Sequence, residues 1–203
     1  MRKFAVLSLA VVLSGCVMTG RAPSLATYDT ASYEKDQYGQ EYMTALFFKY
    51  AAPAKLKTDA LPLCIVKTID NRSVTLSDSS RSWVGPYSGY YYRMGVQREA
   101  GGGEVLSFVS EDKREAVATG TVTHRYTFGM TPIERSVRFT LTAKVGVSET
   151  MFRFDRLEWA QLDTGVAANN GYDRIGAWER ARPELAAENL KTVADELNAC
   201  LSQ

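Results

Sequence analysis

The chain has 203 residues, of which 45% are apolar, and its formal net charge is +1. This length is sufficient for one hydrophobic core and short for two full domains, and the apolar content excludes wholesale disorder. The near-neutral charge gives no indication of a nucleic-acid partner or of a polybasic grip on anionic lipid. We therefore expect one folded domain.

The first twenty residues have the order of a secretory signal. Arg2 and Lys3 form a positive head, residues 4–12 are apolar or small, and residues 13–16 read LSGC. Such a segment is too short and wrongly flanked to be a stable membrane span. The LSGC sequence resembles the lipobox of bacterial lipoproteins. The resemblance implies that residues 1–15 are removed as a signal peptide and that the Cys16 thiol carries a diacylglycerol, with the new amino terminus acylated.

Several acyl chains on one residue make a lasting membrane anchor, whereas a single chain binds reversibly. The residue after the cysteine is Val17. In Gram-negative lipoproteins an Asp at this position often marks retention at the inner membrane, so the resemblance implies an outer-membrane anchor with the domain facing the periplasm. A plain signal peptide with an incidental cysteine, or an uncleaved anchor, is the alternative.

Residues 16–40 follow as a small, polar stretch interrupted by glycine and proline, which is typical of a tether. We therefore divide the chain into a signal peptide (1–15), a lipidated N-terminus and tether (16–40) and a single domain (41–203). Residues 41–52 have apolar side chains at helical spacing and precede Pro53, which predicts a helix, although the aromatics also suit a strand. Residues 63–69 are short and β-branched and predict a strand that continues through a turn into residues 73–76.

Residues 77–103 are rich in serine, glycine and aromatic residues. A stretch of this composition is usually a surface loop, and surface loops often carry function. Its flat amphipathic side chains are candidates for binding a glycan, a peptide or a partner protein. These candidates are Trp83, Tyr87, Tyr90, Tyr91 and Tyr92. The alternative interpretation, which the composition favours, is an irregular strand whose aromatic rings cover the sheet.

Four strand-like runs fill residues 104–162, separated by short polar or glycine-containing connections. A parallel crossover needs about a dozen residues or more, so these connections predict antiparallel neighbours. The third run alternates cleanly, and the positions expected to face the core are Val137, Phe139, Leu141, Ala143 and Val145. The fourth run changes phase after Phe154, which predicts a β-bulge near Asp155 and Arg156.

The last helix is predicted from Pro183 onward, because proline suits the first helical turn. Its narrow apolar stripe consists of Ala186, Leu190, Val193, Leu197 and Leu201. This stripe should lie on the apolar face of the sheet. With Cys16 lipidated, two cysteines remain in an exported chain, Cys64 and Cys200. We predict a disulfide between them, which would join the last helix to the early part of the fold. Two free buried thiols are the alternative.

No catalytic, metal-binding or cofactor-binding pattern emerges from the sequence. His124 is the only histidine and has no cysteine or carboxylate pair at ligand spacing, so we expect a hydrogen-bonded or partly exposed strand residue at an inward position. The glycines at 101–103 lack the context and the lysine of a phosphate-binding loop. The acidic residues at 155–163 lie among arginines, as in a solvated face with ion pairs. We therefore predict a protein that is not an enzyme and needs no metal or cofactor.

The predicted fold is α+β, with one antiparallel sheet of about five strands and the C-terminal helix on one face; a β-sandwich or a lipocalin-like barrel is the alternative. The order of sheet followed by helix over residues 63–201 resembles the small TBP-like domains of exported bacterial lipoproteins of unknown function. The anchor, the neutral charge and the missing catalytic pattern favour an envelope module that binds a partner protein. A ligand-binding or glycan-binding lipoprotein using residues 83–92 is the second hypothesis, and an enzyme built around His124 the third.

Overall fold

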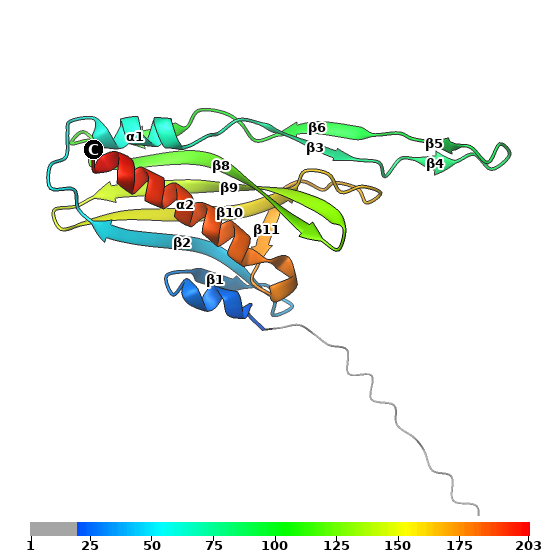
Figure 1. Ribbon diagram of the computed structural model, residues 1–203, viewed down its shortest axis with the longest axis horizontal. Coiled ribbons are helices and arrows are strands. Elements are labelled where there is room, and N and C mark those ends of the chain that lie inside the picture. The colour runs from blue at the N-terminus through cyan, green and yellow to red at the C-terminus, as the bar shows by residue number, and fades with distance from the viewer. Residues whose placement is uncertain (1–19) are drawn as a thin grey trace, which may run out of the picture.

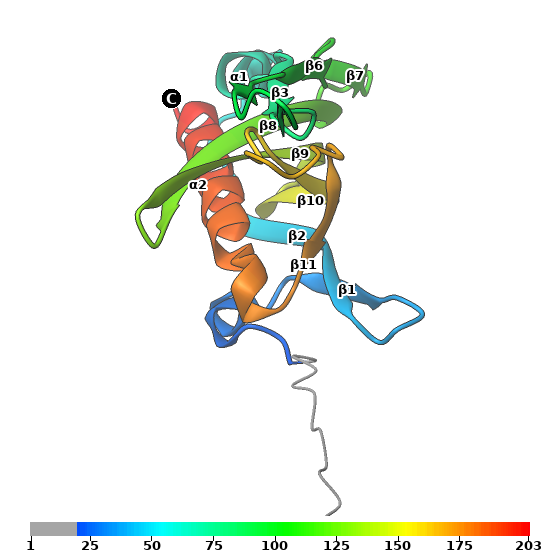
Figure 2. The same ribbon diagram turned by 90° about the vertical axis from the view of Figure 1, so that its right-hand side faces the viewer.

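The computed structural model describes residues 20–203, so the predicted signal peptide and Cys16 lie outside the described residues. Its main element is an open seven-stranded sheet with antiparallel pairing throughout. From edge to edge the strands are β1 (Ser32–Lys35), β2 (Glu41–Ala51), β11 (Asp173–Gly176), β10 (Glu149–Gln161), β9 (Thr131–Val145), β8 (Glu115–Phe128) and β7 (Leu106–Val109). The helix α2 (Pro183–Leu201) crosses one face of this sheet (Figures 1 and 2). The predicted α+β class is confirmed.

The strands β8, β9 and β10 form the long antiparallel centre of the sheet. In β9 the five positions that alternation assigned to the core are all buried, whereas the residues between them belong to the opposite face. The predicted bulge is also present, because the β9–β10 register shifts between Asp155 and Glu158. Arg156 adopts a left-handed backbone with φ of +52° at this point, and the shift turns Leu157 toward the core.

The apolar stripe of α2 packs on the inner face of the sheet, as predicted. All five stripe residues are buried, and they join one hydrophobic cluster with the inward residues of β8, β9 and β10. Gly120 on β8 allows the side chains of Ile69 and Phe139 to lie close to the backbone of the sheet. A Cβ atom at this position would be 2.4 Å from Ile69 and 2.8 Å from Phe139. The chain after α1 (Ala60–Thr68) therefore approaches the sheet closely at this point.

Two element predictions are wrong. The segment 41–52 contains the strand β2 and not a helix. Ala45 and Leu46 are both buried, and this local change of phase gives the apolar residues a spacing that mimics a helix. Residues 63–69 belong mostly to the helix α1, in which Leu61, Cys64 and Ile65 are buried at helical spacing. Packing against α2 and the sheet outweighs the β-branched composition of this segment.

The folded part of the chain begins before residue 41, within the stretch predicted as a tether. The 3₁₀ helix η1 (Pro23–Thr27) places Leu25 in the core, and the backbone N–H of Ala22 donates to the carbonyl of Ala177. β1 then pairs with β2 through four residues. Short elements such as these have no detectable periodicity. None of the helices in residues 20–203 is long and apolar enough to cross a membrane.

The seven strands exceed the expected number because β1, β2 and β11 were not predicted as strands. The predicted strand at residues 73–76 does exist, as β3 (Val74–Asp78), but it pairs with β6 (Val96–Ala100) outside the main sheet. With β1 and β7 at its two edges the sheet is open, so neither the sandwich nor the closed barrel describes it. A short turn, η2 (Glu179–Ala181), leads into α2.

The predicted disulfide between Cys64 and Cys200 is confirmed, with their Cα atoms 5.8 Å apart. It joins α1 to the last turn of α2 and links residues separated by 136 positions. We expect that replacing both cysteines with alanine, in a chain that also carries Cys16→Ser, lowers the free energy of unfolding by up to ~5 kcal/mol, because a long loop is no longer closed in the unfolded state. Urea denaturation measures this loss, and reduction of the parent chain should reproduce it. A change below about 1 kcal/mol would contradict a stabilising role for this bond.

Candidate functional site

A two-stranded arm extends well beyond the end of the main sheet (Figure 1). We define the arm as residues 74–100; its base is the β3–β6 pair, and its outer part is the β4 (Trp83–Val84) and β5 (Tyr91–Tyr92) pair. We define the tip as residues 79–94. All five aromatic residues proposed from the sequence lie in the tip.

The tip is a flat ribbon with aromatic side chains on both faces. Trp83 is opposite Tyr92 in the register, and their rings stack with centroids 4.7 Å apart and an interplanar angle of 18°. Val84 and Tyr91 form the neighbouring pair and therefore face the other way. Gly85 allows the Tyr92 ring to lie close to the backbone, since a Cβ atom there would be 2.9 Å from that ring.

The aromatic residues of the tip are exposed, which contradicts the favoured interpretation that they cover the sheet. Trp83 is 49% exposed, Tyr91 58% and Tyr90 73%, and Tyr87 is fully exposed at the turn. The hydrogen bonds of residues 82–94 with the described chain stay within the arm, for example those between Ser82 and Met94. The tip is thus a surface element, and it gains almost no burial from the rest of the fold.

The charged residues of the tip are all basic. It contains Arg81 and Arg93 and has no aspartate or glutamate. Tryptophan, tyrosine and arginine are the residue types enriched among the strongest contributors to protein interfaces. The tip therefore combines large rigid rings with a positive charge, and this combination suits an apolar surface with an acidic border.

The base of the arm, in contrast, is held firmly by the loop between β10 and β11. The Asn169 side-chain amide donates to the carbonyls of Gln161 and Ser77 at 2.9 and 3.3 Å, and its backbone N–H donates to the Asp78 carboxylate at 3.0 Å. Arg98 of β6 donates to the Asn169 carbonyl at 2.8 Å. Hydrogen bonds from Ser80 and from Asn169 hold the pKa of Asp78 below its usual value. We call these contacts the latch.

Sequence reasoning missed the latch. Asn169 lies in a stretch that reads as a plain loop, and the adjacent residues Asn170 and Gly171 strengthen that reading. No local pattern distinguishes an asparagine that bonds backbone carbonyls of two different strands from one that faces solvent. The contacts depend on β11, a four-residue strand that was not predicted either.

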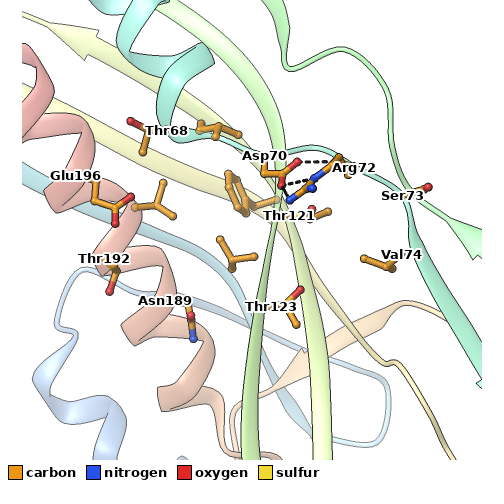
Figure 3. A pocket seen from close by; sticks show the side chains of 14 residues that line it. Thr68, Asp70, Arg72, Ser73, Val74, Thr121, Thr123, Asn189, Thr192 and Glu196 are labelled. Atoms are coloured by element: carbon orange, nitrogen blue, oxygen red, sulfur yellow. Dashed lines mark hydrogen bonds and ion pairs between the residues drawn. The ribbon is translucent and has the colours of Figure 1, made fainter.

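A groove with a cavity of about 530 Å³ lies between α2, the chain after α1 and β8 (Figure 3). Asp70 and Arg72 form an ion pair on one side of it, and this pairing lowers the pKa of Asp70. On the other side Asn189 and Thr192 donate to carbonyls of their own helix. These four polar side chains thus bond within their own segments.

His124 lies on the inner face of β8, as its position in the alternation predicted, and is only 8% exposed. We expected this histidine to be hydrogen-bonded or partly exposed, and it is neither. It is buried, and neither ring nitrogen has a hydrogen-bond partner among the described residues. Its neighbour across the β8–β9 pair is Arg135 rather than a carboxylate. Within residues 20–203 no group of three potential metal ligands is present.

Comparisons with known proteins give one structural neighbour. No protein-family model matches the chain, and no curated protein matches it in sequence. A solved DUF4468 family protein from Bacteroides ovatus is similar over 88% of this chain and 95% of its own length, with 8% sequence identity and a TM-score of 0.45. A likeness of this size assigns neither a family nor a function.

We expect Asn169→Ala to loosen the base of the arm without unfolding the domain. The substitution removes the side-chain donor to the carbonyls of Ser77 and Gln161, although the Ser77 carbonyl keeps the Thr164 N–H as a donor. We therefore expect a loss of about 0.5–1.5 kcal/mol in unfolding free energy. Hydrogen exchange at the Ser77 and Ser79 amides, which donate to Leu162 and Gly165, should become faster. The matched control is Asn170→Ala, since Asn170 is exposed. Equal exchange in both variants would show that the latch does not hold the arm.

Proposed function

We propose that this protein is a membrane-anchored periplasmic lipoprotein that acts as a non-enzymatic partner-binding module in the cell envelope, and that the tip of the arm is its binding element. The proposal combines two independent features. The lipobox-like LSGC sequence at residues 13–16 supports the anchor. The exposed aromatic tip on a firmly attached base supports the binding role.

The exposed tip is the observation that carries the binding role. Large apolar side chains that gather on a surface commonly mark an interaction site, and single scattered ones do not. Here Trp83, Val84, Tyr90, Tyr91 and Met94 are all exposed within one short ribbon. Because the latch orders the base, association with a partner would not require the whole arm to be ordered, which reduces the entropic cost of binding.

The partner that fits this surface is a protein with an apolar cleft and acidic residues around it. The Trp83–Tyr92 stack and Tyr91 present rings on opposite faces of the ribbon, so both faces can be covered by a partner that encloses the tip. Arg81 and Arg93 would then meet carboxylates at the border of the contact.

A glycan or other small molecule is less well supported as the ligand of the tip. Small-molecule sites are concave and enclose most of their ligand. Two cavities, of about 530 and 680 Å³, are lined by residues outside the tip, including α2 and residues 50–57. A smaller cavity of about 210 Å³ at the inner end of the tip is lined by Ser79 and Arg93 but by none of the aromatic residues. The rings of Trp83 and Tyr92 stack on each other, so each has one face covered. Fewer ring faces are therefore free to stack on a sugar.

The lipid anchor has a direct test. We expect mass spectrometry of protein from the membrane fraction to show that the mature chain begins at residue 16 with a lipid-modified cysteine. Cys16→Ser should release the protein in soluble form, because without acyl chains nothing comparable holds it to a bilayer. Cys64→Ser with Cys200→Ser is the control and should stay in the membrane fraction. An unmodified Cys16 in membrane-extracted protein would overturn the anchor.

The binding role is tested by a photo-crosslinking residue at position 91, which faces away from the Trp83–Tyr92 stack. In intact cells this residue should give one defined adduct with an envelope protein, and the same residue at position 130, on the exposed turn between β8 and β9, should not. The partner is then identified and its affinity measured. Tyr91→Ala combined with Tyr90→Ala should weaken binding at least 100-fold, or about 2.7 kcal/mol.

The stability of these variants distinguishes recognition from folding. Because Tyr90 and Tyr91 are exposed, their replacement should change the unfolding free energy by no more than about 0.5 kcal/mol. Phe128→Ala with Met130→Ala, at another exposed turn, is the matched control and should bind normally. Binding that survives in the tyrosine variant would move the interface elsewhere, and binding of an oligosaccharide that is lost with the tyrosines would favour the glycan hypothesis.

A further inference from the structure

The strand β8 has a neighbour on both sides for only part of its length. Its pairing with β9 runs along the whole strand. On the other side β7 pairs with the first part of β8. Next, the Thr119 N–H donates to the carbonyl of Val105, and the Thr121 N–H donates to the carbonyl of Asp70, both at 2.8 Å. Beyond Thr121 no segment of residues 20–203 pairs with this side of β8.

The alternation of the strand leaves main-chain groups without a partner on this side. The N–H groups of Thr119 and Thr121 point away from β9, so the N–H groups of Thr123 and Arg125 point the same way. In an antiparallel ladder the carbonyl of a residue lies on the same side as its N–H. Both Thr123 and Arg125 are exposed. We call this side of the two residues the open edge, and such a row of main-chain groups is a template for a further strand.

The other outer edge of the β8–β9 hairpin is closed by a proline. β10 ends opposite Arg135, and beyond it the carbonyl of Glu134 accepts from the Leu162 N–H at 2.9 Å. The next residue of β9 whose main chain points to that side is Pro132, which has no N–H to donate. Proline at an edge hinders pairing with another chain. The open edge of β8 has no such block, so the two edges of one hairpin differ in their ability to accept a strand.

The open edge borders the groove of about 530 Å³ beside α2. Thr121 and Thr123 of β8 line one side of this groove, and Asn189 and Thr192 of α2 lie across from them (Figure 3). The groove thus leaves space for an extended chain next to β8. Val122 also lines it and is half-buried, so an apolar side chain of an added strand could cover the exposed part of Val122.

Charge favours a segment of another protein over a second copy of this chain. Two copies that pair through their open edges would bring their Arg125 side chains near each other, and residues 121–127 contain no acidic side chain to offset this repulsion. Arg125 forms an ion pair with Glu134 at 2.6 Å, but its side chain is still 69% exposed. A carboxylate on an added strand can therefore still reach it.

We propose that the open edge of β8, together with the groove beside it, is a strand-addition site for an extended segment of another protein. Main-chain hydrogen bonds to Thr123 and Arg125 supply the affinity, and alternate side chains of the segment supply the selectivity. The segment that fits has apolar side chains toward α2 and polar ones on its other face, with an acidic residue near Arg125. This surface is separate from the tip of the arm, and its test depends on neither the lipid anchor nor the partner of the tip.

The probe is a phage-displayed library of random twelve-residue peptides. It is selected on the purified chain carrying Cys16→Ser, with Tyr90→Ala and Tyr91→Ala so that the tip does not dominate the selection. In the free chain the Thr123 and Arg125 amides should exchange their hydrogens fast, whereas the amides of His124 and Tyr126, which point to β9, should exchange slowly. Synthetic copies of the selected peptides should slow exchange at Thr123 and Arg125 at least tenfold. Selection of no peptide, or of peptides that leave these two amides unprotected, overturns the proposal.

A matched pair of variants tests the main-chain contact itself. Thr123→Pro removes one N–H of the open edge and leaves the ladder with β9 intact, because that N–H points away from β9. It should weaken peptide binding at least tenfold, or about 1.4 kcal/mol, whereas Thr123→Val keeps the N–H and should bind like the parent chain. Slow exchange at His124 shows that the variant is folded; if it is not, Arg125→Pro with Arg125→Gln as its control replaces the pair.

Two results with these variants contradict the proposal. Unchanged affinity in a folded proline variant would show that the peptides do not pair with the open edge. A free chain that sediments as a dimer, and as a monomer once Thr123→Pro is introduced, would assign the edge to a second copy of this chain and not to another protein.

Discussion

The packing of α2 on the inner face of the long central strands is the constraint on which the rest of the fold depends. The sheet is open and has one strongly apolar face, which must be covered to be stable in water. The helix covers it with a single stripe that includes Leu190 and Leu197, and it is joined through Cys200 to Cys64 of α1. Hydrophobic burial and the disulfide thus act on the same layer, and no residue of the tip belongs to this hydrophobic cluster.

Different contacts hold the base and the tip of the arm in place. At the base, Asn169 connects β3 to the end of β10 through several backbone groups, so the direction of the arm is determined by the sheet. At the tip, the internal Trp83–Tyr92 stack maintains the shape of the ribbon without help from the body. Residues at the base thus fix the position of the arm, whereas residues of the tip provide the side chains available for contact.

The sequence predicts the parts of this fold that obey a simple period and misses those that depend on distant partners. The alternation in β9, the phase change after Phe154 and the stripe of α2 each reflect burial of one face, and each is present. β2 was predicted as a helix because an irregularity at Ala45 and Leu46 alters the spacing of its apolar residues. For the candidate site, composition located the aromatic residues, but only the structure shows that they leave the sheet. Asn169 carries no local signal at all.

The bulge in β10 has a consequence that reaches the arm. β2 pairs with β10 as far as the pair of Ala45 and Asp155, and beyond the bulge the two strands diverge and β11 occupies the space between them. The chain that enters β11 is the loop carrying Asn169, so the bulge that admits β11 to the sheet also helps to position the latch. Insertions or substitutions in the turn between β4 and β5 would leave the contacts at the base of the arm unchanged. The residues of the tip can therefore change without altering the direction of the arm.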